Sequence, residues 1–235
     1  MEQEKYLYEY PRPAVTTDCV IFGFDEDELK VLLIERDIEP YKGFWALPGG
    51  FIDINEDAET CARRKLREET ALENIYIEQL FTFSSVDRDP RYRVISIAYY
   101  ALVKLSDYSA RAGSCVGHVK WFPLSKIPIL AFDHAEILET AKQRLKGKIK
   151  YQPVGFELLP EKFTLPELHR LYEIVLETSI DRRNFRKKML GFNLLIDHNE
   201  FVKGAPNRAA KIYSFNKRKY EELSENGFYF DCEHI

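Results

Sequence analysis

Gly50-Phe-Ile-Asp-Ile-Asn-Glu56, followed seven residues later by Arg64-Lys65-Leu66-Arg67-Glu68-Glu69-Thr70-Ala71-Leu72, is the stretch that decides the fold of the first part of this chain. It begins at the second residue of a Gly-Gly breaker pair and predicts a helix over about 57–70, capped by Asn55 or Asp57. Residues three or four apart share a helical face, so positions 65, 68 and 69 are neighbours. Two of these neighbours are carboxylates, and the third, Lys65, is an amine.

Segments rich in Val, Ile, Leu and Phe lie on both sides of this helix. Polar or Gly- and Pro-containing turns separate them, so they predict strands. The predicted strands cover 14–24, 30–36, 45–50, 75–84, 94–105 and 118–123, and a second helix is predicted over 134–146. Residues 147–163, with two glycines and two prolines, are interpreted as a linker with some extended structure. This order of elements predicts an α+β fold.

The last third of the chain has the pattern of a small DNA-binding module. Thr164-Leu-Pro-Glu167 is a capping box with a proline in the first turn, so a helix should begin there. Asp181 is the predicted N-cap of a basic helix over 182–190, and strands at 194–196 and 211–215 and a helix at 217–225 follow. Helix, turn, basic helix and basic hairpin together predict a winged helix-turn-helix.

Positive charge is concentrated in this module. The chain has 235 residues and a net charge of −4, but residues 182–219 hold 11 Lys or Arg and only 2 Asp or Glu. Such a concentration is typical of a surface that binds nucleic acid. A solvated basic helix is the alternative interpretation.

The overall composition is that of a folded, water-soluble protein, with 45% hydrophobic and 31% charged residues. The acidic N-terminus lacks the apolar region of a signal peptide, and the apolar runs are too short to cross a bilayer. The four cysteines are scattered without a Cys-x-x-Cys pair, which argues against a zinc site or a disulfide framework. We therefore expect a cytoplasmic protein with no membrane segment, no metal and no cofactor.

The stretch quoted above resembles the Nudix box, whose pattern is Gly, five residues, Glu, seven residues and then Arg-Glu-apolar-x-Glu-Glu-x-Gly-apolar. Seven of the nine defining positions match; Lys65 stands where the box has Glu, and Ala71 where it has Gly. With its winged helix, the chain resembles the Nudix-related transcriptional regulators of bacteria, also at 85–91, 130–134 and 181–190. The resemblance implies a Nudix domain, an α/β/α sandwich, over 1–150 and a winged helix-turn-helix domain over 151–235.

In a working Nudix box, clustered carboxylates hold divalent cations that neutralise phosphates and activate water. Here Lys65 removes one negative charge, adds a positive one and competes with the metal. The degenerate box therefore predicts binding rather than hydrolysis, and no catalytic role is assigned to Glu56, Arg64, Lys65, Glu68 and Glu69. A magnesium-dependent hydrolase of ADP-ribose-type diphosphates is the alternative, because three glutamates of the box remain.

The resemblance implies that the Nudix domain senses a small effector, either an ADP-ribose-type metabolite, a sugar nucleotide or a sugar. The degenerate box is most similar to the arabinose-responsive branch, so L-arabinose is the expected effector. For residues 88–91, the structural alternative to ligand contact is an ion pair within a hairpin loop. For Trp45, the alternative is a position in the core. A pocket with both donors and acceptors suits a polyol, and the candidate ligand-binding residues are Lys65, Glu68, Glu69, Arg88, Asp89, Arg91 and Trp45.

The basic helix and hairpin predict binding to a double-stranded DNA operator, because Arg can donate two hydrogen bonds to guanine and Asn can pair with adenine. One winged helix buries little DNA, so we expect a homodimer on a palindrome, acting as a ligand-controlled repressor. A third interpretation is an interaction protein whose basic module docks an acidic partner. The candidate DNA-binding residues are Arg182, Arg183, Asn184, Arg186, Lys187, Lys203, Arg208 and Lys211.

Overall fold

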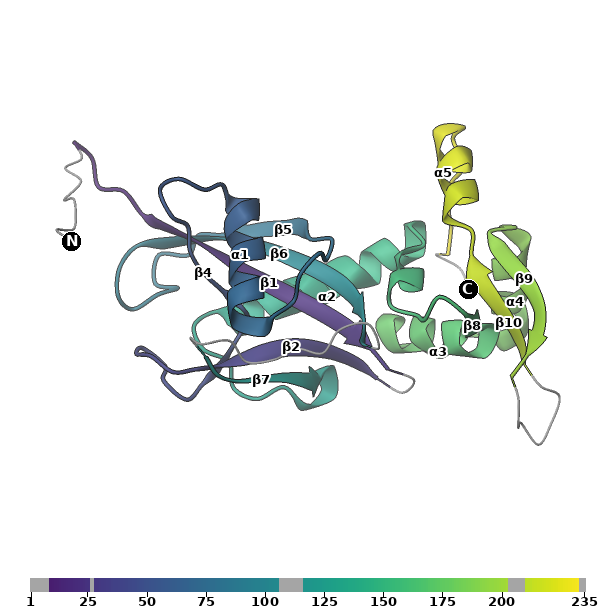
Figure 1. Cartoon of the computed structure of the whole chain (residues 1–235), viewed down its shortest axis with the longest axis horizontal. Helices are drawn as coiled ribbons and strands as arrows, with labels where there is room; N and C mark the ends of the chain where they lie inside the picture. The colour runs from purple at the N-terminus through teal and green to yellow at the C-terminus, as the bar shows by residue number, and fades with distance from the viewer. Residues whose placement is uncertain (1–8, 26–27, 106–115, 203–209, 233–235) are drawn as a thin grey trace.

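The computed structural model describes residues 9–25, 28–105, 116–202 and 210–232. The chain is elongated, with a large sheet-and-helix part at the N-terminal end and a small helical part with a second sheet at the other (Figure 1). Within the described residues, no helix is both long enough and apolar enough to cross a membrane.

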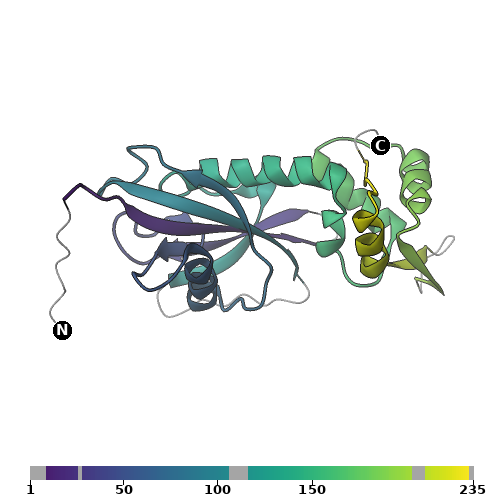
Figure 2. The same cartoon turned by 90° about the horizontal axis from the view of Figure 1, so that it is seen from above.

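The large part is built on a seven-stranded mixed sheet. Its core order is β3-β2-β1-β6-β5, with β4 paired to β1 and β7 paired to β2, and β1 and β6 run parallel. Helix α1 covers one face and α2 the other (Figure 2), which confirms the predicted α/β/α sandwich. The strands are β1 (Ala14–Phe24), β2 (Leu29–Arg36), β3 (Trp45–Ala46), β4 (Gly49–Phe51), β5 (Glu78–Phe83), β6 (Val94–Lys104) and β7 (Val116–Pro123).

Helix α1 spans Ala58–Thr70, and Asp57 caps it by accepting a hydrogen bond from the Thr60 N–H at 2.7 Å. Ala71 ends the helix in the left-handed region with φ 58°, a conformation that glycine adopts at much lower cost. The expected strand over 45–50 is interrupted at Leu47 and Pro48. Pro48 has no N–H, and the Leu47 N–H donates to His134 Nδ1 at 2.9 Å instead of to a neighbouring strand.

Helix α2 spans His134–Tyr151, so the prediction that a linker begins at 147 was wrong. Gly147 lies inside the helix, where glycine costs about 1 kcal/mol relative to alanine. Leu145 and Ile149, four residues apart, are both buried in the core that extends into the C-terminal module, and this burial outweighs the cost. A short turn of 3-10 helix, η3 (Val154–Glu157), follows, and another, η2 (Leu124–Lys126), lies after β7.

The C-terminal part is a winged helix-turn-helix, as predicted. Both hydrogen bonds of the capping box form: the Thr164 hydroxyl accepts the Glu167 N–H, and the Glu167 carboxylate accepts the Thr164 N–H. Asp181 caps the basic helix by accepting the N–H groups of Arg183 and Asn184. Strand β9 is longer than predicted because its pairing with β10 continues out to Phe201. The elements are β8 (Phe163–Thr164), α3 (Leu165–Leu176), α4 (Arg182–Gly191), β9 (Leu195–Phe201), β10 (Lys211–Phe215) and α5 (Lys217–Glu225).

Candidate effector cavity and nucleic-acid interface

A cavity of about 320 Å³ lies beside α1 in the Nudix part. Its wall comes from the first half of β1, from the segment around β4, from the loop before β6 and from the start of α2. This volume is at the lower end of the range for small-molecule sites. Charged side chains dominate the lining, and they include Asp18, Arg36, Asp53, Arg64, Lys65, Glu69, Arg88, Asp89 and Arg91.

Arg64 ties the loop before α1 to the helix. Its guanidinium donates to both carboxylate oxygens of Glu56, with Nε at 2.9 Å from Oε2, and lies 3.2 Å from Glu68 Oε2. The hydrogen bonds from Arg64 lower the pKa of Glu56 to about 2. Glu56 is therefore a charged brace between loop and helix, which is a structural role.

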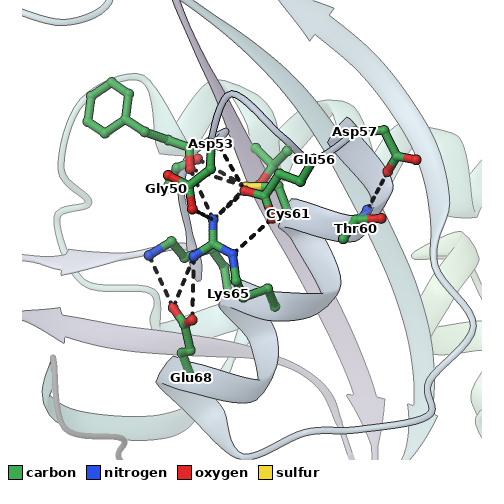
Figure 3. Close-up of polar contacts among 11 residues, drawn as sticks. Gly50, Asp53, Glu56, Asp57, Thr60, Cys61, Lys65 and Glu68 are labelled. Atoms are coloured by element: carbon green, nitrogen blue, oxygen red, sulfur yellow. Dashed lines mark hydrogen bonds and ion pairs between the residues drawn. The ribbon is translucent and has the colours of Figure 1, made fainter. Parts of the chain in front are cut away.

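Lys65 fills the place of the missing glutamate. Its Nζ lies 3.2 Å from Glu68 Oε2 (Figure 3). Its stem passes so close to Gly50 that a Cβ added there would lie 2.7 Å from Lys65 Cε. A larger residue at position 50 would therefore make the lysine side chain shift from this position.

Glu69 points into the protein and is only 8% exposed. Its Oε2 accepts the Gly49 N–H at 2.9 Å. Burial raises the pKa of Glu69 to about 7, against the lowering effects of the Gly49 hydrogen bond and of Lys65. A substantial fraction of this carboxyl is therefore protonated near neutral pH.

The box does not fit the divalent cation that a Nudix hydrolase uses. Glu56 is held by Arg64, Glu68 by Lys65, and Glu69 by a main-chain N–H. In the described ranges no three His, Cys, Asp or Glu side chains are grouped so that they could hold a metal ion. The ammonium of Lys65 would also repel a cation at this position.

Arg88 is part of a buried ion network that joins three elements. Its Nε and Nη2 donate to the two oxygens of Asp133 at 2.8 and 2.7 Å, and Nη2 lies 3.4 Å from Asp18 Oδ2. Asp18 also accepts from Ser96 Oγ at 2.5 Å and lies 3.4 Å from His134 Nε2. Asp133 and His134 begin α2, so the network ties the start of that helix to the floor of the cavity.

Two further guanidiniums lie close to one aromatic ring at the cavity. Arg36 and Arg91 lie 4.8 and 5.6 Å from the centre of the Phe132 ring. Arg91 is paired with Asp89 at 2.7 Å, whereas Arg36 donates to the carbonyls of Pro40 and Ile38. Burial, and then the positive charge of Arg91, lower the pKa of Arg36. The carboxylates of Glu69, Asp89 and Asp18 act in the opposite direction, so this corner of the cavity holds two guanidiniums among several acidic groups.

The structure brings five of the seven candidate ligand residues to the cavity. Glu68 is outside the lining and reaches it only through Lys65. Trp45 also lies elsewhere, with its ring 4.6 Å from that of Phe122, so its packing is that of a core residue. The residues at the cavity are Lys65, Glu69, Arg88, Asp89 and Arg91.

Sequence reasoning missed Arg36, Asp18 and Asp133. The sequence did contain a signal for Asp18. Thr16, Asp18 and Val20 share one face of β1, and the first two are polar although the strand is otherwise rich in apolar residues. Arg36 ends a strand, and nothing in the sequence connects it to the distant Phe132.

Helix α4 and the β9–β10 hairpin lie at the end of the molecule farthest from the N-terminus (Figure 1). Within the described part of the chain, the side chains of five exposed α4 residues have no ion-pair or hydrogen-bond partner: Arg182, Arg183, Asn184, Arg186 and Lys187. Lys211 pairs with Asp197 on the neighbouring strand. Lys203 and Arg208, also expected to contact DNA, lie outside the described residues.

An additional arginine faces the same region from the preceding helix. Arg170 of α3 is exposed and lines a cleft of about 250 Å³ between α3 and α4 together with Arg182 and Arg186. The sequence pattern contained the signal for it, since Arg170 lies between the apolar positions of α3. Three guanidiniums around one cleft make this side of the module strongly positive.

Comparisons with known proteins agree with this two-part geometry. Residues 12–141 match the model of the NUDIX domain, and residues 155–215 match that of the NrtR DNA-binding winged helix domain. The ADPR responsive transcriptional repressor NtrR of Acinetobacter baylyi is 36% identical over 217 residues, which cover 91% of this chain and 86% of that protein. The chain belongs to the NrtR family of Nudix-related transcriptional regulators.

Two solved structures of Shewanella oneidensis NrtR are similar to this chain. NrtR in complex with a 27mer DNA has a TM-score of 0.71 and 37% identity, covering 86% of this chain and 93% of that chain. The NUDIX domain of the same protein in complex with ADP ribose has a TM-score of 0.54 and 39% identity, covering 58% and 90%. The placement of this chain in the arabinose-responsive branch is not supported, because the relatives named here respond to or bind ADP-ribose.

Proposed function

We propose that this NrtR-family regulator is a repressor that binds operator DNA through its winged helix and responds to ADP-ribose bound in the Nudix cavity. The observation that carries the effector assignment is the Arg36–Arg91 pair on Phe132. Arg91 is paired with Asp89, whereas Arg36 donates to main-chain carbonyls and has no anionic partner among the described residues. A diphosphate supplies such a partner, and a neutral pentose does not, so the charge of the site favours ADP-ribose over arabinose.

Aromatic and hydrogen-bonding groups around this pair suit the rest of a nucleoside diphosphate sugar. Phe132, Phe51 and Arg91 offer flat faces for a base or sugar. Glu69, Lys65 and Asp53 offer acceptors and a donor on the α1 side. The lysine in the box supports binding without hydrolysis, because it holds Glu68 and repels the cation that cleavage requires.

The DNA-binding half of the proposal is based on the unpaired cations of α4. Arg183, Asn184 and Lys187 lie on the exposed side of the helix, opposite the buried Phe185 and Met189. Arg170, Arg182 and Arg186 flank them and suit the phosphate backbone. We also propose that two copies bind together, since a two-fold dimer doubles the contacts of so small a module.

Helix α2 is the route by which effector and DNA would influence each other. At its start, Asp133 is held by Arg88 and His134 lies beside Asp18, both in the cavity wall. Further along, Lys142 and Lys146 lie 3.7 and 3.1 Å from Glu177 at the end of α3, and its buried residues are part of the core shared with the winged helix. We therefore place the domain boundary near 150, with α2 belonging to the Nudix domain and packing against both domains.

The proposal is tested by titrating the full-length protein with ADP-ribose, AMP and L-arabinose by calorimetry, and by following release of a labelled operator from its own upstream region. We expect ADP-ribose to bind and to release the operator, and Arg36→Gln to weaken both effects. Coupling is reciprocal, so operator DNA should weaken ADP-ribose binding by the same factor. Binding of L-arabinose with no response to ADP-ribose would refute the effector assignment, and failure to bind any upstream DNA would refute the function.

A further inference from the structure

Thr16 has a buried hydroxyl at the cavity wall without a partner. The residue lies in β1, with Phe51 of β4 and Ser96 of β6 opposite it, and it is 8% exposed. It lines the cavity, yet its Oγ1 has no hydrogen-bond partner among the residues the structure describes. Buried hydroxyls normally have partners, because an unpaired one gives up its water without compensation.

Other buried hydroxyls close by are paired. Thr17, the next residue of β1, donates to Cys61 Sγ at 3.4 Å on the opposite side of the strand. Ser96 donates to Asp18 at 2.5 Å, and Thr70 donates to the Leu66 carbonyl at 2.6 Å. The Tyr172 hydroxyl shares the unpaired state, but it lies in the winged-helix core beside Cys232 and away from the cavity.

Two carboxylates that line the cavity together with Thr16 already have other partners. Asp18, two residues along on the same face, already contacts Arg88, Ser96 and His134. Asp89 is engaged by the side chain and the N–H of Arg91. Asp18 and Asp89 are thus each bound to an arginine, and the Thr16 hydroxyl remains a neutral donor and acceptor on a residue that lines the cavity.

We propose that Thr16 is a specificity-determining residue whose hydroxyl forms a hydrogen bond with an oxygen of the sugar-phosphate part of the effector. The inference rests on the proposed function for the identity of that effector. A neutral hydroxyl can donate to a phosphoryl oxygen and can both donate to and accept from a ribose hydroxyl. The effector thereby completes a hydrogen bond that the ligand-free protein leaves unmade.

The test is Thr16→Val, which replaces the hydroxyl by a methyl group of similar size. Because the hydroxyl is unpaired without ligand, the variant should melt higher than the wild type, by about 2 °C or more. Its affinity for ADP-ribose, measured by calorimetry, should fall about 5- to 30-fold. Thr16→Ser keeps the hydroxyl and should restore most of the affinity. A merely structural threonine would not produce opposite effects on stability and binding.

Thr17→Val is the matched control on the same strand. It removes a paired hydroxyl on the other face, so it should lower the melting temperature and leave ADP-ribose affinity unchanged. The inference is overturned if Thr16→Val binds ADP-ribose as tightly as the wild type, or if it melts lower, as Thr17→Val does. Failure of the wild type to bind ADP-ribose would reject the effector of the proposed function, and the ligand-free melting temperatures would still decide whether the Thr16 hydroxyl is unpaired.

Discussion

Helix α1 of the Nudix domain and helix α4 of the winged helix are both rich in arginine and lysine. On α1, Arg63 is paired with Glu59, Arg64 with Glu56 and Lys65 with Glu68. The exposed cations of α4 between positions 182 and 187 have no such partners in the part of the chain that the structure describes. Charges that are neutralised in place hold a loop and a helix together, whereas charges left unpaired remain available for phosphate.

The largest expected effect on binding is the loss of operator affinity in variants of α4. Replacing Arg183 and Arg186 together by Gln should weaken operator binding about 30-fold or more, because each removes a contact to base or phosphate. The slope of log affinity against log salt should fall by about 0.9 for each lost phosphate contact. Fluorescence anisotropy at several salt concentrations measures both quantities. Stability should change by less than about 0.5 kcal/mol, since these side chains are exposed and unpaired.

Arg218→Gln is the matched control, because Arg218 is an exposed arginine of α5 already paired with Glu222. It should leave operator affinity and salt slope close to those of the wild type. Equal losses in the control and in the α4 variant would mean that general positive charge, and not the unpaired set on α4, determines binding.

The second effect concerns Glu69, the carboxylate of α1 that is buried and accepts a main-chain N–H. Burial raises its pKa from 4.5 to about 7, so the folded chain holds this proton more tightly than the unfolded chain. Its contribution to stability is full below about pH 4.5 and is lost as the pH rises through 7. At pH 8 the ionised Glu69 lowers the free energy of unfolding by an amount of the order of 3 kcal/mol, and Glu69→Gln should remove this loss.

Urea unfolding of the wild type and of Glu69→Gln from pH 4.5 to 8 measures this effect. Gln can still accept the Gly49 N–H, so the two proteins should have similar stability at pH 4.5. The variant should become the more stable of the two as the pH rises through 7. Glu68→Gln should instead lower the stability near neutral pH. Burial raises the pKa of Glu68, but Lys65 and Arg64 outweigh burial, so the pKa is lowered overall. Parallel pH profiles for wild type and Glu69→Gln would contradict the proposed titration.

The third prediction tests the pairing on α1 by restoring the box. Lys65→Glu removes the lysine partner of Glu68, leaving Arg64 as its cationic neighbour, and places a third carboxylate on the same helical face. Magnesium should then stabilise the variant, by about 1.4 kcal/mol at a concentration ten times its dissociation constant, and should leave the wild type unchanged. Thermal melts with and without magnesium measure this. Lys65→Gln removes the lysine without adding a ligand, and an equal magnesium response in that variant would count against the restored site.

The smallest effect is expected for a pair that bridges the two domains. Glu177→Gln breaks the contacts of Lys142 and Lys146 with the end of α3. These groups are partly exposed, so the coupling free energy between ADP-ribose and operator should fall by less than about 1 kcal/mol. Glu139→Gln is the control, because Glu139 pairs with Lys142 within α2 itself. Coupling that falls equally in both variants would show that the interdomain bridge has no special role.

The elements with local signals could be predicted from the sequence. The Asp57, Thr164 and Asp181 caps were each visible as a side chain that can accept the free N–H groups of the next turn, and each helix begins there. The prediction that a linker begins at 147 was wrong because it was based on the low helix propensity of Gly147. The buried contacts of Leu145 and Ile149 that hold the helix through it come from distant parts of the chain.

The candidate site was predictable only in part for the same reason. Lys65 and Glu69 belong to a motif with fixed spacing, and both reach the cavity. Trp45 does not, since a tryptophan near a breaker pair has the same local pattern whether it faces a ligand or the core. The charge of the site also depended on Arg36, whose partner ring belongs to another part of the chain.

By itself the sequence determined that a Nudix-type helix carries an amine in its carboxylate set and that a winged helix with a basic second helix follows, because these features are encoded within a few turns of chain. Only the tertiary structure decided that Arg88 joins Asp133 and Asp18, residues 45 and 70 positions away, and that α2 connects the cavity to the DNA-binding domain. Spacing along a helix is fixed by its geometry, but contacts between distant segments exist only after the sheet and helices have packed.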